Sequence, residues 1–478
     1  MLGKIHKTHG AITKIEVKYL YAGIVISSVF IFGGIAVRAN ALFVTAFLLW
    51  IYMMMYSYKA IERRSLLFAF GIAFFVFLIG REFLEQYKLY DKEWEFGVDV
   101  DNHLYTCLIL ALLGVWGSFM AFSKKTRITH LYSEDRYNRI AKRISRNIYF
   151  VVLPFGMTYW LAIAYIVAKT GYIGYYADIT EMMDGNPLFN ILNKISVMLN
   201  VSFCCYISTL PTKKEFKKIL ISYLAFLFIT AFSGQRGPFI LGILLIFIFI
   251  VYMQRLFPTD NWFNRKYLKI GLLLVPFLAS AGSIYNAWRM ERDTEDIGFG
   301  ETFFNFFYEQ GVTSYIVKRA YVHEDKIPED IYTLQFTHTG ILARLLGIEV
   351  YAGNTVEHAT KGGSFAHALG YVVLGNKYLL GQGTGSSYVA ELYYDFGYIG
   401  VFLGSIIYGY MFTLIFRSKS LMQRGTVFVC ITQLLWSCRA SYTGFLTLLF
   451  TPTSIIVCLF TFILPRKIIK IGKRKFFK

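Results

Sequence analysis

Residues 362–400 decide how the rest of the chain is understood, and they read GGSFAHALGYVVLGNKYLLGQGTGSSYVAELYYDFGYIG. An apolar run, a glycine-rich turn and a second, longer apolar run follow one another here. The stretch places His367, Lys377 and Glu391 beside apolar sequence. Ionisable side chains are costly at a membrane boundary, and their presence there indicates a functional site. We therefore expect the remaining chain to form a membrane platform that holds this stretch on one side of a bilayer.

The composition of the chain is typical of a membrane protein. Of its 478 residues, 56% are hydrophobic and 18% are aromatic. Apolar runs of roughly twenty residues, the length that crosses a bilayer as a helix, recur along the chain. The sequence predicts an all-α polytopic fold with about twelve transmembrane helices. The predicted spans are 19–37, 41–58, 65–80, 103–122, 148–168, 190–210, 218–233, 238–253, 268–286, 388–416, 425–443 and 445–464.

The charged residues alternate between the segments that join these spans. The net charge is +19, and the Lys and Arg residues gather in the N-terminus, 59–64, 123–147, 211–218, 254–269, 417–424 and 466–478. The intervening segments 81–102 and 169–187 are acidic. Because cytoplasmic loops are enriched in Lys and Arg, both termini are predicted to be cytoplasmic. The dispersal of the basic residues over separate segments argues against a nucleic-acid-binding surface.

This topology places a long segment on the outer face, together with residues 233–237 and the turn near Arg439. The chain is predicted to divide into N-terminal transmembrane helices (1–286), the outer segment (287–387), C-terminal transmembrane helices (388–464) and a basic cytoplasmic tail (465–478). Within the outer segment, residues 301–322 carry several aromatic side chains on one helical face. They are expected to form either a helix lying in the membrane interface or a structural prop.

The sequence predicts neither a metal site nor a cofactor. The six cysteines all lie in predicted spans and form no CxxC pair, which is typical of small apolar core residues. The histidines of the outer segment fit no zinc motif; they are His323, His338, His358 and His367. The first apolar run follows a basic leader and is too long for a signal peptide, so we expect a retained anchor.

Arginines at the outer face are candidate phosphate ligands. Arg236 lies in FSGQRGP (232–238), between two apolar spans, where a tight turn requires Gly and Pro but no cation. It is expected either to bind phosphate through its guanidinium fork or to fix the depth of a span by snorkelling. Arg289 and Arg292 are one helical turn apart, which suits either a pyrophosphate or an ion-pair network with nearby acids.

The 362–400 stretch itself supplies candidate catalytic groups. His367 precedes an apolar run and is a candidate proton donor or acceptor. Glu391 falls in the first turn of a predicted span, where it is either a general base with a raised pKa or a favourable charge at a helix N-terminus. The turn before it offers helix-start amides that suit an anion; the candidate binding residues here are Lys377, Gly383, Gly385, Ser386 and Ser387.

Three stretches together resemble the Wzy-type oligosaccharide repeat-unit polymerases of bacterial O-antigen and capsule synthesis. They are FSGQRGPFI (232–240), FFYEQGVTSYIVK (306–318) and residues 362–409, in which GSSYVAELYYDFGYIG is the most specific part. The resemblance implies a GT-C-type membrane glycosyltransferase that uses no nucleotide sugar. It implies transfer of a growing glycan from undecaprenyl pyrophosphate to a lipid-linked repeat unit.

The resemblance also implies a location and partners. The enzyme is expected in the bacterial cytoplasmic (inner) membrane, with its active face external. Its partners are expected to be the lipid-linked donor and acceptor, membrane lipids, a chain-length regulator and a flippase. Two other functions stay open. One is a ligase that moves a finished glycan to another acceptor, and the other is a polysaccharide transporter or flippase. The absence of an internal repeat and the gathering of charged residues at the outer edge disfavour the transporter.

Overall fold

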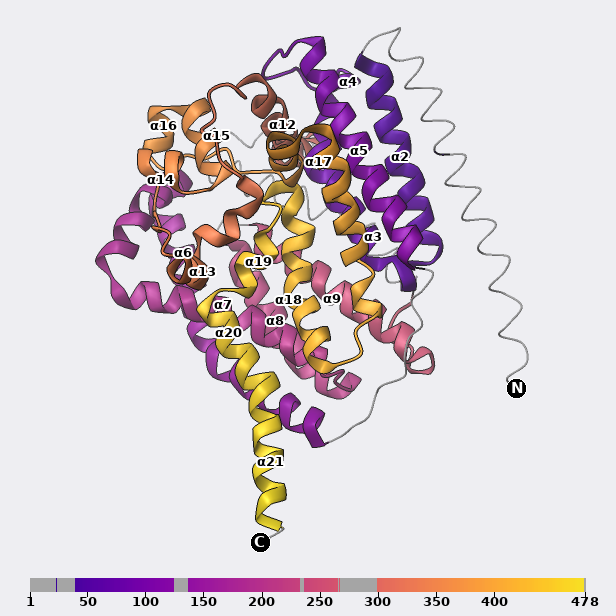
Figure 1. Ribbon diagram of the computed structural model, residues 1–478, viewed down its shortest axis with the longest axis vertical. Coiled ribbons are helices and arrows are strands. Elements are labelled where there is room, and N and C mark those ends of the chain that lie inside the picture. Colours follow the sequence, from indigo (N-terminus) through magenta and orange to yellow (C-terminus); the bar gives the residue numbers. More distant parts are fainter. Residues whose placement is uncertain are drawn as a thin grey trace, which may run out of the picture.

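The computed structural model describes residue 23 and residues 39–123, 136–232, 236–264, 266 and 299–476. Every regular element in these residues is a helix (Figure 1). The elements before the outer segment are α2 (Ala39–Lys59), α3 (Ile61–Phe74), η1 (Phe75–Ile79), α4 (Gly80–Gln86), α5 (Val98–Ser123), α6 (Arg136–Gly185), α7 (Pro187–Ser208), α8 (Lys213–Phe232), α9 (Arg236–Leu256) and η2 (Pro258–Asp260).

The outer segment consists of short helices, and longer helices follow it. The short helices are α11 (Phe299–Gln310), α12 (Thr313–Val322), η3 (Tyr332–His338), α13 (Gly340–Leu346), α14 (Val356–Lys361), α15 (Phe365–Leu374) and α16 (Asn376–Leu379). After them come α17 (Tyr388–Met411), η4 (Leu414–Phe416), α18 (Leu421–Trp436), η5 (Ser437–Arg439), α19 (Gly444–Leu449), α20 (Pro452–Cys458), η6 (Leu459–Ile463) and α21 (Leu464–Phe476).

Seven helical segments of the described residues are long and apolar enough to cross a membrane. They are 41–59, 61–86, 98–123, 136–169, 187–208, 237–256 and 388–416. Each overlaps one of the predicted spans, which confirms the polytopic all-α fold but not the predicted number of about twelve helices. The span predicted at 268–286, and that at 19–37 apart from residue 23, lie outside the described residues.

Three predicted spans differ from the structure. The span predicted at 218–233 begins five residues earlier, because α8 starts at Lys213 with a charged turn. The span predicted at 425–443 overlaps α18, which has only 16 residues, starts earlier at Leu421 and ends at Trp436, before η5. The span at 445–464 was predicted as one helix, but it is broken between α19 and α20. The break arises because Pro452 has no backbone N–H to continue a helix, and Thr451 instead caps the start of α20 by accepting from the N–H of Ser454.

The core lies between the helices that are most enclosed by protein. In the apolar stretch of the span 61–86, 78% of the residues are buried, so this span is internal. In the span 136–169 the buried share is only 28%, so this span lies at the outside of the bundle. Helices α5 and α17 pack closely through small residues. A Cβ added at Gly114 would lie 2.6 Å from the carbonyl oxygen of Phe402, so this contact requires glycine.

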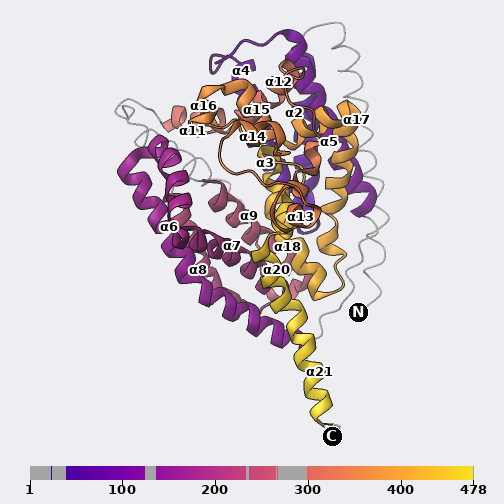
Figure 2. The same cartoon turned by 60° about the vertical axis from the view of Figure 1, so that its left-hand side comes forward.

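The short helices of the outer segment gather at one end of the molecule. Figures 1 and 2 show α12, α15 and α16 at the end opposite α21. The prediction of a single helix at 301–322 is wrong, because the helix is interrupted at Gly311 and divides into α11 and α12. A Cβ at Gly311 would collide with Arg81, so the close approach of this turn to α4 requires glycine. Helix α12 is buried against α5 and α17, which favours the structural prop over an interfacial helix.

Candidate functional site

The first turn of α17 carries a fully buried carboxylate. Glu391 has an exposed fraction of 0%, and both of its oxygens accept hydrogen bonds. The Ser386 hydroxyl donates to Oε1 over 2.6 Å, and the backbone N–H of Tyr442 donates to Oε2 over 2.8 Å. A buried polar group whose hydrogen bonds are all made holds the segments that it joins rigidly together. Glu391 therefore fixes the segment between η5 and α19 against the start of α17.

The next turn of α17 also holds distant backbone. The Asp395 carboxylate accepts the backbone N–H groups of Tyr332 at 3.1 Å and Thr333 at 2.7 Å. The Tyr394 hydroxyl donates to the backbone carbonyl of Ile327 over 3.0 Å. These bonds attach the outer segment to α17. The acidic and tyrosine residues of this motif therefore position two other parts of the chain.

The glycine-rich turn before α17 forms an open approach to the helix start. Gly381 and Gly385 have φ angles of 94° and 76°, in the left-handed region that glycine adopts without strain. No atom lies within 4 Å of a Cβ built at Gly383. Ser387 is the N-cap of α17, and its buried hydroxyl has no hydrogen-bond partner within the described residues. A spare hydroxyl and first-turn amides at this position suit an anion.

His367 belongs to a polar cluster within the outer segment. Its Nδ1 lies 2.8 Å from the Tyr378 hydroxyl, and its ring stacks on that of His358 with centroids 3.7 Å apart. Burial, together with the neighbouring His358, lowers the pKa of His367 to about 4. The imidazole is therefore neutral and able to accept a proton at neutral pH. An anion bound nearby would raise this pKa and make His367 a stronger base.

The lowered pKa of His367 predicts a pH dependence of stability. Between the ordinary pKa of 6.5 and the folded value of about 4, the unfolded chain binds a proton that the folded chain does not. The free energy of unfolding should therefore decrease as the pH falls through this range. The variant His367→Asn should show a shallower decrease. Thermal midpoints of wild type and variant in detergent, measured from about pH 7.5 to 4.5, test this; equal slopes would contradict it.

Turn η5 ends in Arg439, a partly buried cation. Its guanidinium donates to the backbone carbonyl of Gln310 at 3.4 Å and to the side-chain oxygen of the same residue at 3.2 Å. Its central carbon lies 5.8 Å from the centre of the Phe77 ring. Arg439 is thus held between the end of α11 and the helix that leads into α4.

The start of α9 meets the same aromatic side chains. Phe77 packs edge-on against Trp436, with ring centroids 5.1 Å apart. A Cβ added at Gly237 would lie 3.0 Å from the Trp436 indole, so the helix start approaches that ring closely. Helix α9 begins at Arg236, the residue before Gly237. The start of α9 and Arg439 therefore border one aromatic pair.

A second set of buried charges surrounds Arg81, whose exposed fraction is 2%. Its guanidinium carbon lies 4.0 Å from the ring centres of both Tyr308 and Tyr315. The same guanidinium donates to Glu85 and Glu93, each over 2.8 Å. Cation–π contacts and charge-assisted hydrogen bonds together satisfy this buried cation. They tie α4 to the outer segment.

Lys318 on α12 completes this buried charge cluster. Its ammonium lies 3.0 Å from Glu82 and 2.7 Å from Asp101. Glu82 also accepts the hydroxyls of Ser314 and Tyr105, each over 2.8 Å. Burial lowers the pKa of Lys318, but the two carboxylates outweigh burial and raise that pKa overall, so the side chain is charged. The cluster clamps α12 against α4 and α5.

The three distant stretches quoted from the sequence therefore meet in space. Gly237, in the described part of the stretch 232–240, lies against Trp436, the residue before η5. Residues 306–318 contribute Gln310 beside Arg439. Residues 362–409 contribute Glu391, which holds Tyr442 beyond the same turn.

The sequence matches the family described as O-antigen polysaccharide polymerase Wzy over residues 19–470, nearly the whole chain. The chain belongs to this family. No curated protein and no solved structure matches it. Membership of the Wzy family shows a role in O-antigen repeat-unit polymerisation, and it confirms the family predicted from the three stretches.

The predicted site residues of this Wzy-family chain fall into separate groups. Ser386 contacts Glu391 directly, and Ser387 lies beside Ser386 at the start of α17. His367 is in a different cluster, with Tyr378 and His358. Lys377 is exposed on the short helix α16. Arg289 and Arg292 lie outside the described residues, and for Arg236 the structure describes only the backbone.

Sequence reasoning did not select Arg439 or the charge cluster around Lys318 as functional. Arg439 was placed on the outer face without a role. The predicted spans end at residue 80 and begin again at residue 103, so the acids of the cluster fall in a segment expected to be an acidic loop. The structure extends the helices over 61–86 and 98–123 and buries the two acids that Lys318 binds. Arg81 and Glu85 do have the i,i+4 spacing of a helical ion pair, which the structure shows at 2.8 Å.

Proposed function

We propose that this protein polymerises oligosaccharide repeat units carried on undecaprenyl pyrophosphate, at the outer face of the cytoplasmic membrane. The family match over residues 19–470 carries the proposal. The meeting of three distant stretches around η5 supports a single site at the end of the molecule that bears the outer segment. In a GT-C-type arrangement, such a site lies beside the membrane and draws both substrates from it.

The proposed reaction moves the growing glycan from its carrier to a new lipid-linked unit. The bond between the anomeric carbon and the pyrophosphate oxygen breaks, and that carbon bonds to an acceptor hydroxyl oxygen. The hydroxyl proton passes to a base, and undecaprenyl pyrophosphate leaves. The leaving group is already activated, so the reaction requires no nucleotide sugar. Cations that neutralise the charge developing on the pyrophosphate lower the barrier.

Arg439 is proposed for this task, since it contacts Phe77 of the aromatic pair whose other member, Trp436, lies against the start of α9. Arg236, Arg289 and Arg292 are proposed to join it around the pyrophosphate. The turn and helix start at Gly383, Gly385, Ser386 and Ser387 are proposed to supply backbone amides and the Ser387 hydroxyl to the same anion, and Lys377 an additional charge at the rim.

His367 is proposed as the proton acceptor. The catalytic role of Glu391 stays a prediction, and its contacts favour positioning. Both of its oxygens are occupied by groups of this chain, and its side chain is fully buried. Through the backbone of Tyr442, it fixes the segment that follows Arg439.

Reconstitution tests the proposed function. The purified protein in lipid nanodiscs is given one undecaprenyl-pyrophosphate-linked repeat unit and a chelator, without nucleotide sugar. We expect a ladder of multiples of the unit on a glycolipid gel. Folded protein that yields no ladder with its cognate unit would contradict the polymerase. Transfer of a preformed chain only to a different acceptor would indicate the ligase, and movement of the unit across the membrane without transfer would indicate the flippase.

A further inference from the structure

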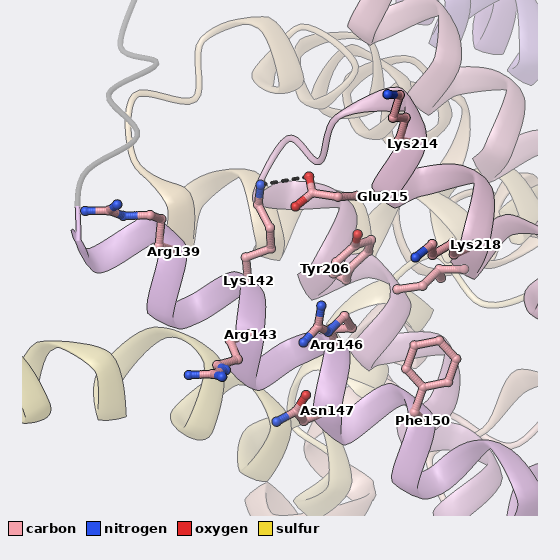
Figure 3. A pocket seen from close by; sticks show the side chains of 11 residues that line it. Arg139, Lys142, Arg143, Arg146, Asn147, Phe150, Tyr206, Lys214, Glu215 and Lys218 are labelled. Atoms are coloured by element: carbon pink, nitrogen blue, oxygen red, sulfur yellow. Dashed lines mark hydrogen bonds and ion pairs between the residues drawn. The ribbon is translucent and has the colours of Figure 1, made fainter.

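A pocket of about 740 Å³ opens where the start of α6 meets the end of α7 and the start of α8 (Figure 3). Six basic side chains line it: Arg139, Lys142, Arg143, Arg146, Lys214 and Lys218. Glu215 is the only acidic side chain among the described lining residues, and Lys142 binds it over 3.0 Å. The other five cations therefore give the pocket a large excess of positive charge.

These five cations are exposed, and none has an ion pair within the parts of the chain that the structure describes. Arg139, Arg143 and Arg146 follow one face of α6, and Lys214 and Lys218 follow one face of α8. Like charges at these spacings repel one another, and cations near a helix N-terminus oppose the helix dipole. The general enrichment of cytoplasmic loops in Lys and Arg explains the number of these cations. It does not explain why cations from two helices line one cavity.

The pocket is not uniformly polar. Phe150 lies beyond Arg146 and Asn147 along α6 (Figure 3), and its side chain is 44% exposed. Ile219 on α8 and the buried ring of Tyr206 on α7 also line the pocket. Helix α6 continues from here as a candidate membrane span. The cavity therefore combines a cationic mouth with an apolar wall that leads along a membrane helix.

We propose that this pocket binds the phosphate headgroup of an anionic membrane phospholipid. Arginine forks bind phosphate bidentately, and basic pockets between membrane helices suit anionic headgroups. The exposed ring of Phe150 provides apolar surface for the acyl chains. The occupied pocket links α6 to α8 and removes the repulsion between their cations. The site lies at the end of the molecule that carries α21, away from the outer segment, so it is separate from the polymerisation site (Figures 1 and 2).

The binding of phosphatidylglycerol to the purified full-length protein in neutral detergent tests the proposal. The thermal midpoint is followed as the lipid is titrated, with phosphatidylcholine as the zwitterionic comparison. The triple variant R143Q/R146Q/K218Q should bind phosphatidylglycerol on the order of 100-fold more weakly, since each basic residue near anionic lipid contributes about 1 kcal/mol. The single variant R146Q should bind phosphatidylglycerol about fivefold more weakly. It replaces the triple variant as the test if the triple variant does not fold.

The matched control is K217Q/K467Q/K470Q, which removes the same charge from residues that do not line the pocket. Its affinity for phosphatidylglycerol should equal that of wild type. Equal losses in the triple variant and the control would overturn the proposal, because general surface charge would then explain binding. A full effect from phosphatidylcholine, or from inorganic pyrophosphate alone at the same phosphate concentration, would overturn it as well.

Discussion

The variant Arg439→Gln is expected to form polymer about 100- to 1,000-fold more slowly than wild type, while the protein stays folded in the membrane. The proposed reaction develops charge on a departing pyrophosphate, and Arg439 contacts the aromatic pair that the start of α9 also approaches. Glutamine keeps hydrogen-bonding capacity but removes the charge and the fork. Initial rates of ladder formation in nanodiscs measure the effect. Arg439→Lys should be intermediate, because lysine restores the charge without the planar geometry.

The exposed Arg344 on α13 provides the control for this prediction. Arg344→Gln removes the same charge from the outer segment and should leave the polymerisation rate close to that of wild type. An unaltered rate in Arg439→Gln, with correctly inserted protein, would remove Arg439 from the site. Equal losses in both variants would show that only the overall charge matters.

A double variant separates positioning by Glu391 from catalysis. If Glu391 acts by fixing the segment after Arg439, then E391Q/R439Q should be no slower than the slower of the two single variants, since both changes affect one element. Effects that multiply would instead assign Glu391 an independent role, as the general base predicted from the sequence.

The variant Lys318→Met is expected to lose about 3–5 kcal/mol of stability, the largest structural effect predicted here. The substitution removes the cation that lies 3.0 Å from Glu82 and 2.7 Å from Asp101. Asp101 keeps Lys92 at 3.2 Å, so Glu82 bears most of the loss. The unfolding midpoint in detergent should fall strongly, and polymer formation should be lost with the fold. The measurement is thermal unfolding of the purified variant beside wild type.

The same substitution at exposed Lys326, just beyond α12, is the matched control and should change stability by less than about 0.5 kcal/mol. In the double variant K318M/E82Q one uncompensated charge is removed, so part of the lost stability should return. A wild-type midpoint for Lys318→Met would contradict the role of this cluster as a clamp.

Hydropathy and charge were sufficient to predict much of the fold. Apolar runs long enough to cross a bilayer have few alternatives to a helix, because lipid cannot satisfy exposed backbone groups. The predicted spans at 41–58, 65–80 and 103–122 were therefore confirmed. Hydropathy predicted one continuous helix at 445–464, which was wrong, because an average over the segment does not detect the local break at Pro452. The three motif stretches were also sufficient to identify the Wzy family from the sequence.

Which residues meet at the candidate site could be learned only from the tertiary structure. No local pattern brings Gln310, Glu391 and Gly237 to one short turn, because these contacts depend on how helices far apart in sequence pack. The same is true of Lys318, which lies in a stretch expected to form either an interfacial helix or a structural prop. In the structure it is buried and paired with carboxylates of α4 and α5. Sequence by itself determined which segments are apolar and which motifs the chain contains, since both are properties of neighbouring residues. Only the tertiary structure decided which charges become partners, because burial and pairing depend on the packing of separate helices.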